Sequence, residues 1–304
     1  MICIDLSQTV ISSCTVQLHN ELKRGDRDQN KLLIKHMTFN TILGLKKKFN
    51  STHGSKVVLA CDSKDYWRRD YFPPYKGHRK FAKAKSDQDW DMIYEAVNEI
   101  KADLREYFPY HVVEVPKAEA DDVIACLAKY SQTADLTQVG LFEEEPEPFL
   151  AVSRDGDFKQ LQKWSNVSQW SIIDKKMLKE PKPEKYLLNH IIVGDAGDNI
   201  PSVLNGDDWA KARAEGKSLR AAPMKDKRLQ SFLINGAAEC VNESEKRNWA
   251  RNENLVSFEK IPANIYKSII DEYVGYEVKG NKTKLMSYFS KNRMKQLFSE
   301  LDNF

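Results

Sequence analysis

Short apolar runs alternate with longer stretches of helical periodicity over the first 190 residues of the chain. The apolar runs, each short enough for one buried strand, are residues 2–6, 56–60, 111–115 and 149–152. Helical periodicity is found in residues 31–49, 88–107 and 118–130. Strands that alternate with helices are typical of a sheet with helices on both faces. We therefore predict an α/β fold with a parallel-rich central sheet.

The pattern changes toward the C-terminus. Residues 131–148 are polar and acidic, which predicts a solvated loop inserted between two elements. Two prolines mark a turn before a helical stretch at 186–193, and beyond it strand signals fade into a mostly helical, basic segment. This predicts two domains, an α/β domain at 1–190 and a smaller, mostly helical domain at 191–304.

Carboxylates cluster at the ends of the predicted strands and at helix starts. Nine of them are candidates for one site: Asp5, Asp62, Glu119, Asp121, Asp122, Asp155, Asp157, Asp195 and Asp198. In a parallel sheet the ligand crevice lies beyond the carboxyl ends of the strands. Asp5, Asp62 and Asp155 lie at that end of their strands, so one crevice can collect them.

Nine like charges in one crevice need counter-ions. Two carboxylates about 4 Å apart repel by on the order of 4 kcal/mol at the effective dielectric of a protein surface. The candidate set contains no histidine, and oxygen-only sites favour hard cations, Mg²⁺ with Mn²⁺ as a substitute. Two such ions together suit hydrolysis of a phosphodiester. The pattern thus predicts a histidine-free site for two Mg²⁺ ions.

Each cluster also has a simpler interpretation when it is taken alone. The acids at 119–122 open a helix, where carboxylates complement the helix dipole. The Asp155-Gly156-Asp157 motif is also found in the loops of many phosphate enzymes, and residues 194–199 also fit a turn with Asp and Asn side chains capping backbone amides. The ordered succession of the clusters on matching elements favours one shared site.

Residues 66–85 combine cations with aromatic rings, seven Lys or Arg residues with six aromatic residues and one acid. Cations can follow phosphates while rings stack on bases, a combination that suits single-stranded nucleic acid. The alternative is a basic surface segment with rings such as Trp67 and Phe72 in the core. Two prolines and a glycine should interrupt helix formation here. The candidate nucleic-acid contacts are Arg68, Arg69, Tyr75, Lys76, Arg79, Lys80 and Lys83.

Composition narrows the class of protein. The 304 residues are 41% hydrophobic and 30% charged, and no apolar run approaches the roughly 18 residues of a membrane helix. The N-terminus lacks the basic start and apolar core of a signal peptide. Five widely spaced cysteines without a C-x-x-C pair predict reduced, mostly buried thiols and a cytoplasmic protein. Apart from the nine acids the chain is basic, which fits a polyanionic substrate as well as an ordinary mixed-charge surface.

Six motifs occur in a fixed order along the chain: IDLSQ, ACDS, YWRRDYFPPYKGHR, EADD, SRDGDF and GDAGDN. In this order they resemble the flap endonuclease (5′-nuclease) family, in particular the ribonucleases H of T-even bacteriophages, over nearly the whole chain. The resemblance implies a metal-dependent 5′ to 3′ exonuclease and flap endonuclease. Such an enzyme removes RNA primers and adjacent DNA during lagging-strand replication, in the host cell cytoplasm if a phage encodes it.

The resemblance also implies roles for matching residues. The acids around two metal ions correspond to Asp5, Asp62, Glu119, Asp121, Asp122, Asp155 and Asp157, with Asp195 and Asp198 on the second-ion side. Lys76 and Arg79 correspond to cations that contact the scissile phosphate at the base of a helical arch, here about residues 66–100. With Asp121 and Asp155 they are the candidate catalytic residues. The segment after Asp198 corresponds to a helix-three-turn-helix element that grips duplex DNA.

Two departures from the family pattern affect the expected partners. Residues 200–208 replace the usual proline and Gly-x-Gly hairpin, so the hairpin's potassium and phosphate site is left open. The candidate duplex contacts are instead Lys211, Arg213, Lys217 and Arg220. The chain starts directly at its first strand, so clamp binding through an N-terminal tail is not expected. The expected partners of a monomeric enzyme are RNA–DNA hybrids, flap or forked DNA and the single-stranded-DNA-binding protein of the replisome.

Two other functions remain as alternatives. A phosphatase of the haloacid dehalogenase type also places aspartates after parallel strands. Its chemistry needs an Asp-x-Asp motif at the first strand, whereas Asp5 is followed here by Leu6 and Ser7. The second alternative is a catalytically weak nucleic-acid-binding relative, against which the presence of Lys76 and of all the matched acids argues.

Overall fold

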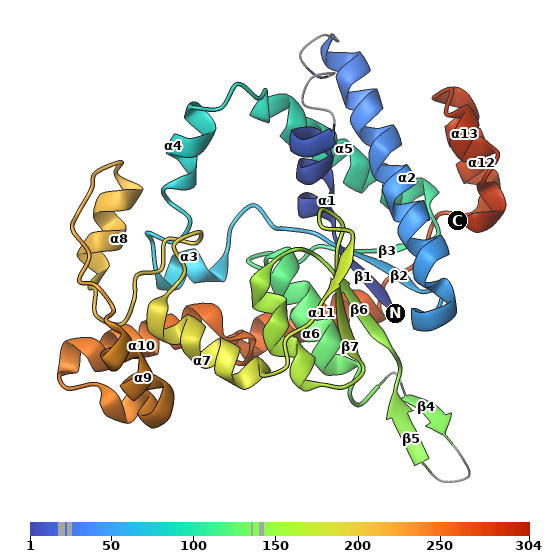
Figure 1. Ribbon diagram of the computed structural model, residues 1–304. Coiled ribbons are helices and arrows are strands. Elements are labelled where there is room, and N and C mark those ends of the chain that lie inside the picture. The colour runs from blue at the N-terminus through green and yellow to red at the C-terminus, as the bar shows by residue number, and fades with distance from the viewer. Residues whose placement is uncertain (18–21, 23–25, 135, 140–142) are drawn as a thin grey trace.

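A six-stranded sheet forms the centre of the computed structural model, which describes residues 1–17, 22, 26–134, 136–139 and 143–304 (Figure 1). Its strands in spatial order are β3 (His111–Val113), β2 (Val57–Ala60), β1 (Ile2–Asp5), β6 (Phe149–Val152), β7 (Val167–Ser171) and β8 (Lys176–Leu178). All neighbouring strands pair in parallel except β7 and β8. The predicted parallel-rich sheet is confirmed.

Helices cover both faces of this sheet, as predicted (Figure 1). Two of them, α2 (Arg27–His53) and α5 (Trp90–Tyr107), pack on one face, and α6 (Ala120–Tyr130) packs on the other. Alternate residues of β1 serve the two faces, because Ile2 and Ile4 pack with α2 and α5 whereas Cys3 packs with α6. Burial on both faces explains why these strands are continuous apolar runs.

Of the remaining α-helices, α1 (Leu6–Ser12) follows β1 directly, and the others form the arch and the C-terminal half. These others are α3 (Trp67–Tyr71), α4 (Arg79–Ala84), α7 (Pro183–Val193), α8 (Asp207–Ala214), α9 (Asp226–Asn235), α10 (Glu243–Val256), α11 (Ala263–Val274), α12 (Lys282–Lys291) and α13 (Lys295–Phe298). In Figure 1, α3 and α4 make an arm that runs from the end of the sheet to α5, and α7 to α10 gather at one end of the molecule. Helix formation stops between α3 and α4, where the prolines and glycine were expected to interrupt it.

Two helices from the last third of the chain, α11 and α12, pack into the apolar clusters on the two faces of the central sheet. Ile265 and Ile269 of α11 pack into the cluster under α6, and Leu285 and Phe289 of α12 pack into the cluster beneath α2 and α5. Helices α7 to α10 contribute to two smaller apolar clusters, one of which includes Phe72 and Tyr75 of the arch base. The division at residue 190 stays a prediction, and the covering of the sheet depends on both halves of the chain.

Two features differ from the sequence expectations. β7 and β8 were not predicted, because β7 buries the polar residues Gln169 and Ser171 in place of an apolar run. The loop expected at 131–148 contains an antiparallel hairpin of β4 (Leu136–Val139) and β5 (Glu143–Pro146), while residues 135 and 140–142 lie outside the described residues. Cross-strand pairing satisfies the backbone of this polar segment without a core of its own.

Two expectations from composition can also be compared with the structure. All five cysteines are free thiols and all are buried, as predicted. Among the residues that the structure describes, no helix has both the length and the apolar character needed to cross a membrane.

Gly280 provides a test of how the C-terminal segment is seated. A Cβ built on Gly280 would lie 2.1 Å from the Phe108 carbonyl oxygen, whereas one built on Gly44 in α2 has no heavy atom within 4 Å. We expect Gly280→Ala to lower the free energy of unfolding by about 1–3 kcal/mol through overpacking. The matched control Gly44→Ala should raise it by about 0.5–1 kcal/mol, because alanine is the better helix former. Urea unfolding of both variants measures this, and equal stabilities would contradict the packing.

Candidate active site

Three carboxylates are aimed from the ends of neighbouring parallel strands. Asp5 ends β1 and accepts a hydrogen bond from a backbone amide of α1 (2.9 Å). Asp62 follows β2 and accepts one from the first residue of α6 (3.0 Å). Asp155 follows β6 and accepts one from the Asp157 amide (2.9 Å). Because β2, β1 and β6 are adjacent, the structure brings these three side chains to one edge of the sheet.

Burial and mutual repulsion raise the pKa of several carboxyls at this edge. The pKa of Asp5 rises to about 8, first because the group is buried and then because Asp62 lies close to it. Burial and the neighbouring Asp155 raise the pKa of Asp121, and the same two causes raise the pKa of Asp157 to about 8. A divalent cation would restore the ionised carboxylates, so this donor set fits a metal centre.

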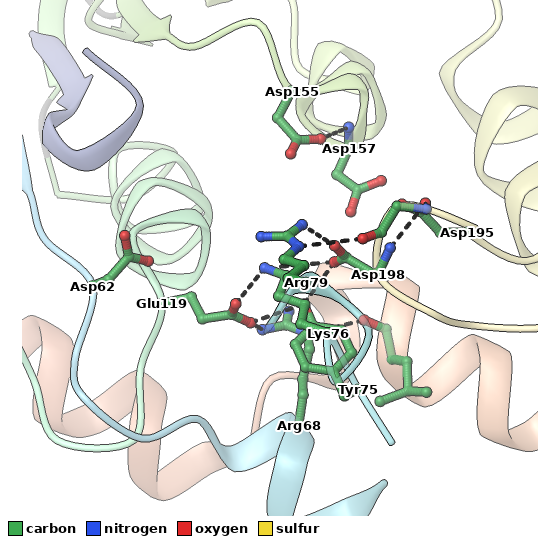
Figure 2. A network of polar contacts seen from close by, with 12 residues as sticks. Asp62, Arg68, Tyr75, Lys76, Arg79, Glu119, Asp155, Asp157, Asp195 and Asp198 are labelled. Carbon is green, nitrogen blue, oxygen red and sulfur yellow. Dashed lines mark hydrogen bonds and ion pairs between the residues drawn. The ribbon is translucent and has the colours of Figure 1, made fainter. Parts of the chain in front are cut away.

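Two cations lie on the other side of the cluster. Lys76 Nζ donates to Glu119 Oε1 (2.5 Å) and lies 3.6 Å from Asp198 Oδ2. Arg79 Nη2 donates to Asp198 Oδ1 (2.5 Å). Figure 2 shows both cations between Glu119 and Asp198. Although burial opposes the shift, Lys76 and Arg68 hold the pKa of Glu119 low, at about 2. The structure therefore places the two candidate catalytic cations against candidate metal ligands.

A buried ion pair lies behind Glu119. Arg68 Nη1 is 2.9 Å from Glu119 Oε2 and 2.8 Å from Asp122 Oδ1. The other oxygen of Asp122 accepts hydrogen bonds from Trp67 Nε1 and from the Glu119 amide, both 3.0 Å. Asp122 is fully buried, and both of its carboxylate oxygens are engaged by Arg68, Trp67 and the Glu119 amide. Its contacts anchor the arch base to the start of α6.

Two expected nucleic-acid contacts are corrected by their burial. Arg68 and Tyr75 are only 3% and 2% exposed. Tyr75 Oη lies 2.7 Å from Asp198 Oδ2 and 3.1 Å from Glu119 Oε2, so it orients site carboxylates and offers no face for a base to stack on. Trp67 and Phe72 are buried as well, which supports the alternative that part of this segment belongs to the core.

Asn199 holds together the two loops that carry these charges. Its buried side-chain amide donates to the carbonyl of Pro74 (2.8 Å) and to that of Ala210 (2.9 Å). The backbone amide of Lys76 donates to the carbonyl of Asp198 (2.9 Å). Both Lys76 and Asn199 have positive φ, at 54° and 65°, a conformation kept by these cross-loop bonds. The arch base and the GDAGDN loop therefore form one unit.

The second-ion side contains a histidine, which corrects the expectation of a histidine-free site. His190 Nε2 lies 3.4 Å from Asp195 Oδ2, and Nδ1 of the same ring lies 3.6 Å from Asp157 Oδ1. These three residues could together hold a metal ion. His190 belongs to the helix before the GDAGDN loop, a position that no spacing rule links to Asp157. Only the packing of α7 against residues 156–163 brings them together.

The other arch cations lie toward solvent. Arg69 and Lys80 are exposed. Lys83 is half-buried, because its Nζ hydrogen-bonds Tyr94 Oη and lies 5.4 Å from the centre of the Trp90 ring. Lys83 therefore links α4 to α5 across the arch.

The four candidate duplex contacts differ in their exposure and in the partners that they already have. Lys211 and Arg220 are exposed, and the one ion pair described for Lys211, with Asp208, is long (3.7 Å). Lys217 is exposed but closely paired with Glu215 (2.7 Å). Arg213 Nη1 donates to the Ala196 carbonyl (2.6 Å), so it supports the loop of Asp195 and Asp198. Lys211 and Arg220 are the better placed of the four to meet a phosphate.

The buried Arg68 can be tested by stability. Arg68→Met should lower the free energy of unfolding by about 3–5 kcal/mol, because it leaves the buried Asp122 without its cation and Glu119 with Lys76 alone. The deficit should shrink as the pH falls toward the unfolded-state pKa of about 3.9 for Asp, since protonation removes the unpaired charge.

The control is the neighbouring, exposed Arg69. Arg69→Met should change the free energy of unfolding by less than about 1 kcal/mol. Urea unfolding of the two variants at pH 7.5 and pH 5 measures the difference. Equal losses for Arg68 and Arg69, or a loss that grows with acid, would show that the buried pairing is not what stabilises the arch base.

Comparisons with known proteins show the family to which the chain belongs. The family described as "5'-3' exonuclease, N-terminal resolvase-like domain" matches residues 19–187, and "T4 RNase H, C terminal" matches residues 182–304. Ribonuclease H of Enterobacteria phage T4 is 33% identical over 307 residues, which cover 99% of this chain and 94% of that protein.

Solved structures share the fold. A bacteriophage T5 flap endonuclease, in a pseudo-enzyme–product complex with DNA and metal ions, has a TM-score of 0.59 at 17% identity, covering 90% of this chain and 97% of that one. The T5 5'-exonuclease with bound zinc has a TM-score of 0.55 at 18% identity, covering 96% and 97%. Because one family profile matches more than half of the chain and the phage T4 enzyme is 33% identical over nearly all of it, the chain belongs to the 5′-3′ exonuclease family and is a nuclease.

Proposed function

We propose that this nuclease is a metal-dependent 5′ to 3′ exonuclease and flap endonuclease that removes RNA primers and adjacent DNA during lagging-strand replication. The observation that carries the proposal is the group of carboxylates beyond β1, β2 and β6, bordered by Lys76 and Arg79. The kinship with a phage ribonuclease H supports action on RNA–DNA hybrids, and the DNA complex of a relative with this fold supports flap or forked DNA as a substrate.

The carboxylates fall into two candidate ligand groups. One contains Asp5, Asp62, Asp121 and Asp155, and the other contains Asp157, Asp195 and Asp198. Bound there, a pair of Mg²⁺ ions, with Mn²⁺ as a substitute, supplies Lewis-acid stabilisation of the phosphoryl oxygens and acidifies water. Glu119 forms ion pairs with Lys76 and Arg68. Asp122 forms an ion pair with Arg68, and we assign it to positioning this edge of the site.

Lys76 and Arg79 perform a different task from the acids. Both lie beside the candidate ligand Asp198, so their positive charge adjoins the position where a phosphate would meet the metal ions. Stabilisation of negative charge that develops on a phosphoryl group in the transition state is the usual use of such cations. Asp121 and Asp155 contribute ligand oxygens at the reacting centre, where their charge is most needed.

The substrate backbone has two candidate tracks. The exposed arch cations Arg69 and Lys80, with Lys83 at the far end of α4, suit a single strand that approaches along the arch. The exposed Lys211 and Arg220 lie beyond the GDAGDN loop and suit duplex phosphates. The site between these tracks would then cut close to a junction of single and double strand.

Metal removal tests the chemistry. EDTA should abolish cleavage of a 5′-labelled flap and of an RNA–DNA hybrid, and Mg²⁺ or Mn²⁺ but not Ca²⁺ should restore it. Asp155→Asn and Asp121→Asn should each lower the single-turnover rate by at least about 100-fold while nucleic-acid binding is kept. Asp28→Asn, at a side chain that is 94% exposed in α2, is the control. Full turnover in excess EDTA would sink the metal mechanism, and binding without cleavage under all conditions would favour a non-catalytic relative.

A second pair of variants separates chemistry from grip. Lys76→Ala should lower the cleavage rate far more than the affinity for a flap substrate measured in Ca²⁺, since its cation acts chiefly on transition-state charge. Lys211→Ala should instead weaken binding and reduce the slope of log K against log salt by about 0.9, as for one lost phosphate contact. The reverse pattern would exchange the roles of the two regions.

A further inference from the structure

His190 is seated where one helix crosses a loop of the active site. A Cβ at Gly156 would lie 2.5 Å from Tyr186 Oη, so glycine at this position lets α7 approach the loop of Asp155 and Asp157. His190 lies one turn after Tyr186 on the same helix. The close approach delivers its ring into the acidic cluster.

The ring faces carboxylates at both of its nitrogens. Nε2 is 3.4 Å from Asp195 Oδ2 and Nδ1 is 3.6 Å from Asp157 Oδ1. One ligand atom from each of the three residues lies within 4.8 Å of the others. The side chains are 16%, 17% and 27% exposed for His190, Asp157 and Asp195, so the group is shielded and still open to small ions.

A neutral imidazole cannot make favourable contacts with both of these carboxylates. A neutral ring has one N–H donor and one lone pair, so one of its two carboxylate contacts sets a lone pair against a negative oxygen. His190 Nε2 and Asp157 Oδ1 are both buried atoms without a hydrogen-bond partner. Buried polar atoms without a partner destabilise the folded protein. A cation bound between these two atoms would give each of them a partner.

We propose that His190 supplies a nitrogen ligand to a metal ion held with Asp157 and Asp195, which makes the second-ion position of this nuclease selective for a first-row transition metal over Mg²⁺. The proposal rests on the proposed metal-dependent function. With metal–nitrogen and metal–oxygen bonds of about 2.1 Å, two ligand atoms at a tetrahedral angle are about 3.4 Å apart, which is the separation of His190 Nε2 and Asp195 Oδ2.

A nitrogen ligand changes which ion the position prefers. Imidazole ligands raise affinity for ions such as Co²⁺ and Zn²⁺, and Mn²⁺ also tolerates them, whereas Mg²⁺ prefers oxygen alone. One of the two positions would then be a hard-ion site and the other a mixed nitrogen–oxygen site.

The rival explanation is an imidazolium that donates to both carboxylates without a metal–nitrogen bond. Pulsed electron paramagnetic resonance on the full chain loaded with Mn²⁺, without nucleic acid, distinguishes the two. We expect nitrogen coupling from an imidazole ligand in the unmodified protein. It should be lost in His190→Gln and kept in His36→Gln, a control in α2 whose ring contacts only Asn40 among the polar partners described.

Calorimetric titrations with Co²⁺, Mn²⁺ and Mg²⁺ give the second readout. His190→Gln should weaken binding of Co²⁺ at one site by at least about tenfold, which is the smallest loss typical of a disturbed metal shell. Mg²⁺ binding should change less, and His36→Gln should match the unmodified protein. Absence of nitrogen coupling in the unmodified protein, or Co²⁺ affinity unchanged in His190→Gln, would overturn the proposal in favour of the imidazolium. Both readouts are independent of cleavage, so a protein that binds metal through His190 and fails to cut would refute the proposed function alone.

Discussion

The negative charge buried at one edge of the central sheet sets the electrostatic conditions that the arch, α7 and any bound ion have to meet. Parallel strands bring carboxylates to one edge of the sheet, and burial together with mutual repulsion raises the pKa of Asp5, Asp121 and Asp157. The described salt bridges balance only part of this charge, through Arg68, Lys76 and Arg79 against Glu119, Asp122 and Asp198. Glu119 and Asp122 with these cations form the paired half of the site, and the remaining carboxylates form the unpaired half, which is suited to metal ions. Asp198 lies at the border, because it contacts Lys76 and Arg79 and is also a candidate ligand.

The paired half has a mechanical consequence. The residues that neutralise Glu119 and Asp198 belong to the arch base. The ion pairs that balance the charge of the site therefore also hold the arch in place. Asn199 fixes the arch turn to α8, and a Cβ on Gly77 would lie 2.8 Å from Ala214 Cβ. Phe81 of α4 also packs within 3.0 Å of where a Cβ of Gly216 would lie. A single strand bound by the arch and a duplex bound near α8 would thus contact two elements that are packed against each other.

In the unpaired half of the site, His190 lies beside Asp157 and Asp195. Its ring adds nitrogen to a group that would otherwise offer only oxygen, and it does so from α7, the helix that joins the sheet to the C-terminal helices. The two halves of the site are consequently built from different partners. Arch cations complete one, and a helix before the GDAGDN loop completes the other.

Local patterns in the sequence are sufficient to find β1, β2 and β6 and the acids that follow them. Apolar runs that end at Asp5 and Asp62 are local patterns, as are the periodicity of α5 and the prolines that separate α3 from α4, and local patterns survive folding when they agree with the core. β7 escaped detection because Gln169 and Ser171 are buried by polar contacts that no periodicity reveals, such as the bond from Gln169 to the Ser153 carbonyl.

Which charged residue contacts which depends on how distant segments pack. Arg68 lies 51 positions from Glu119 in the chain, and its burial turned an expected nucleic-acid contact into a structural ion pair. His190 lies 33 positions from Asp157 and reaches it because α7 packs against the loop after β6. Residue type and spacing fix what a side chain can do, but distance and burial, which set the strength of every electrostatic contact, arise only when distant segments pack.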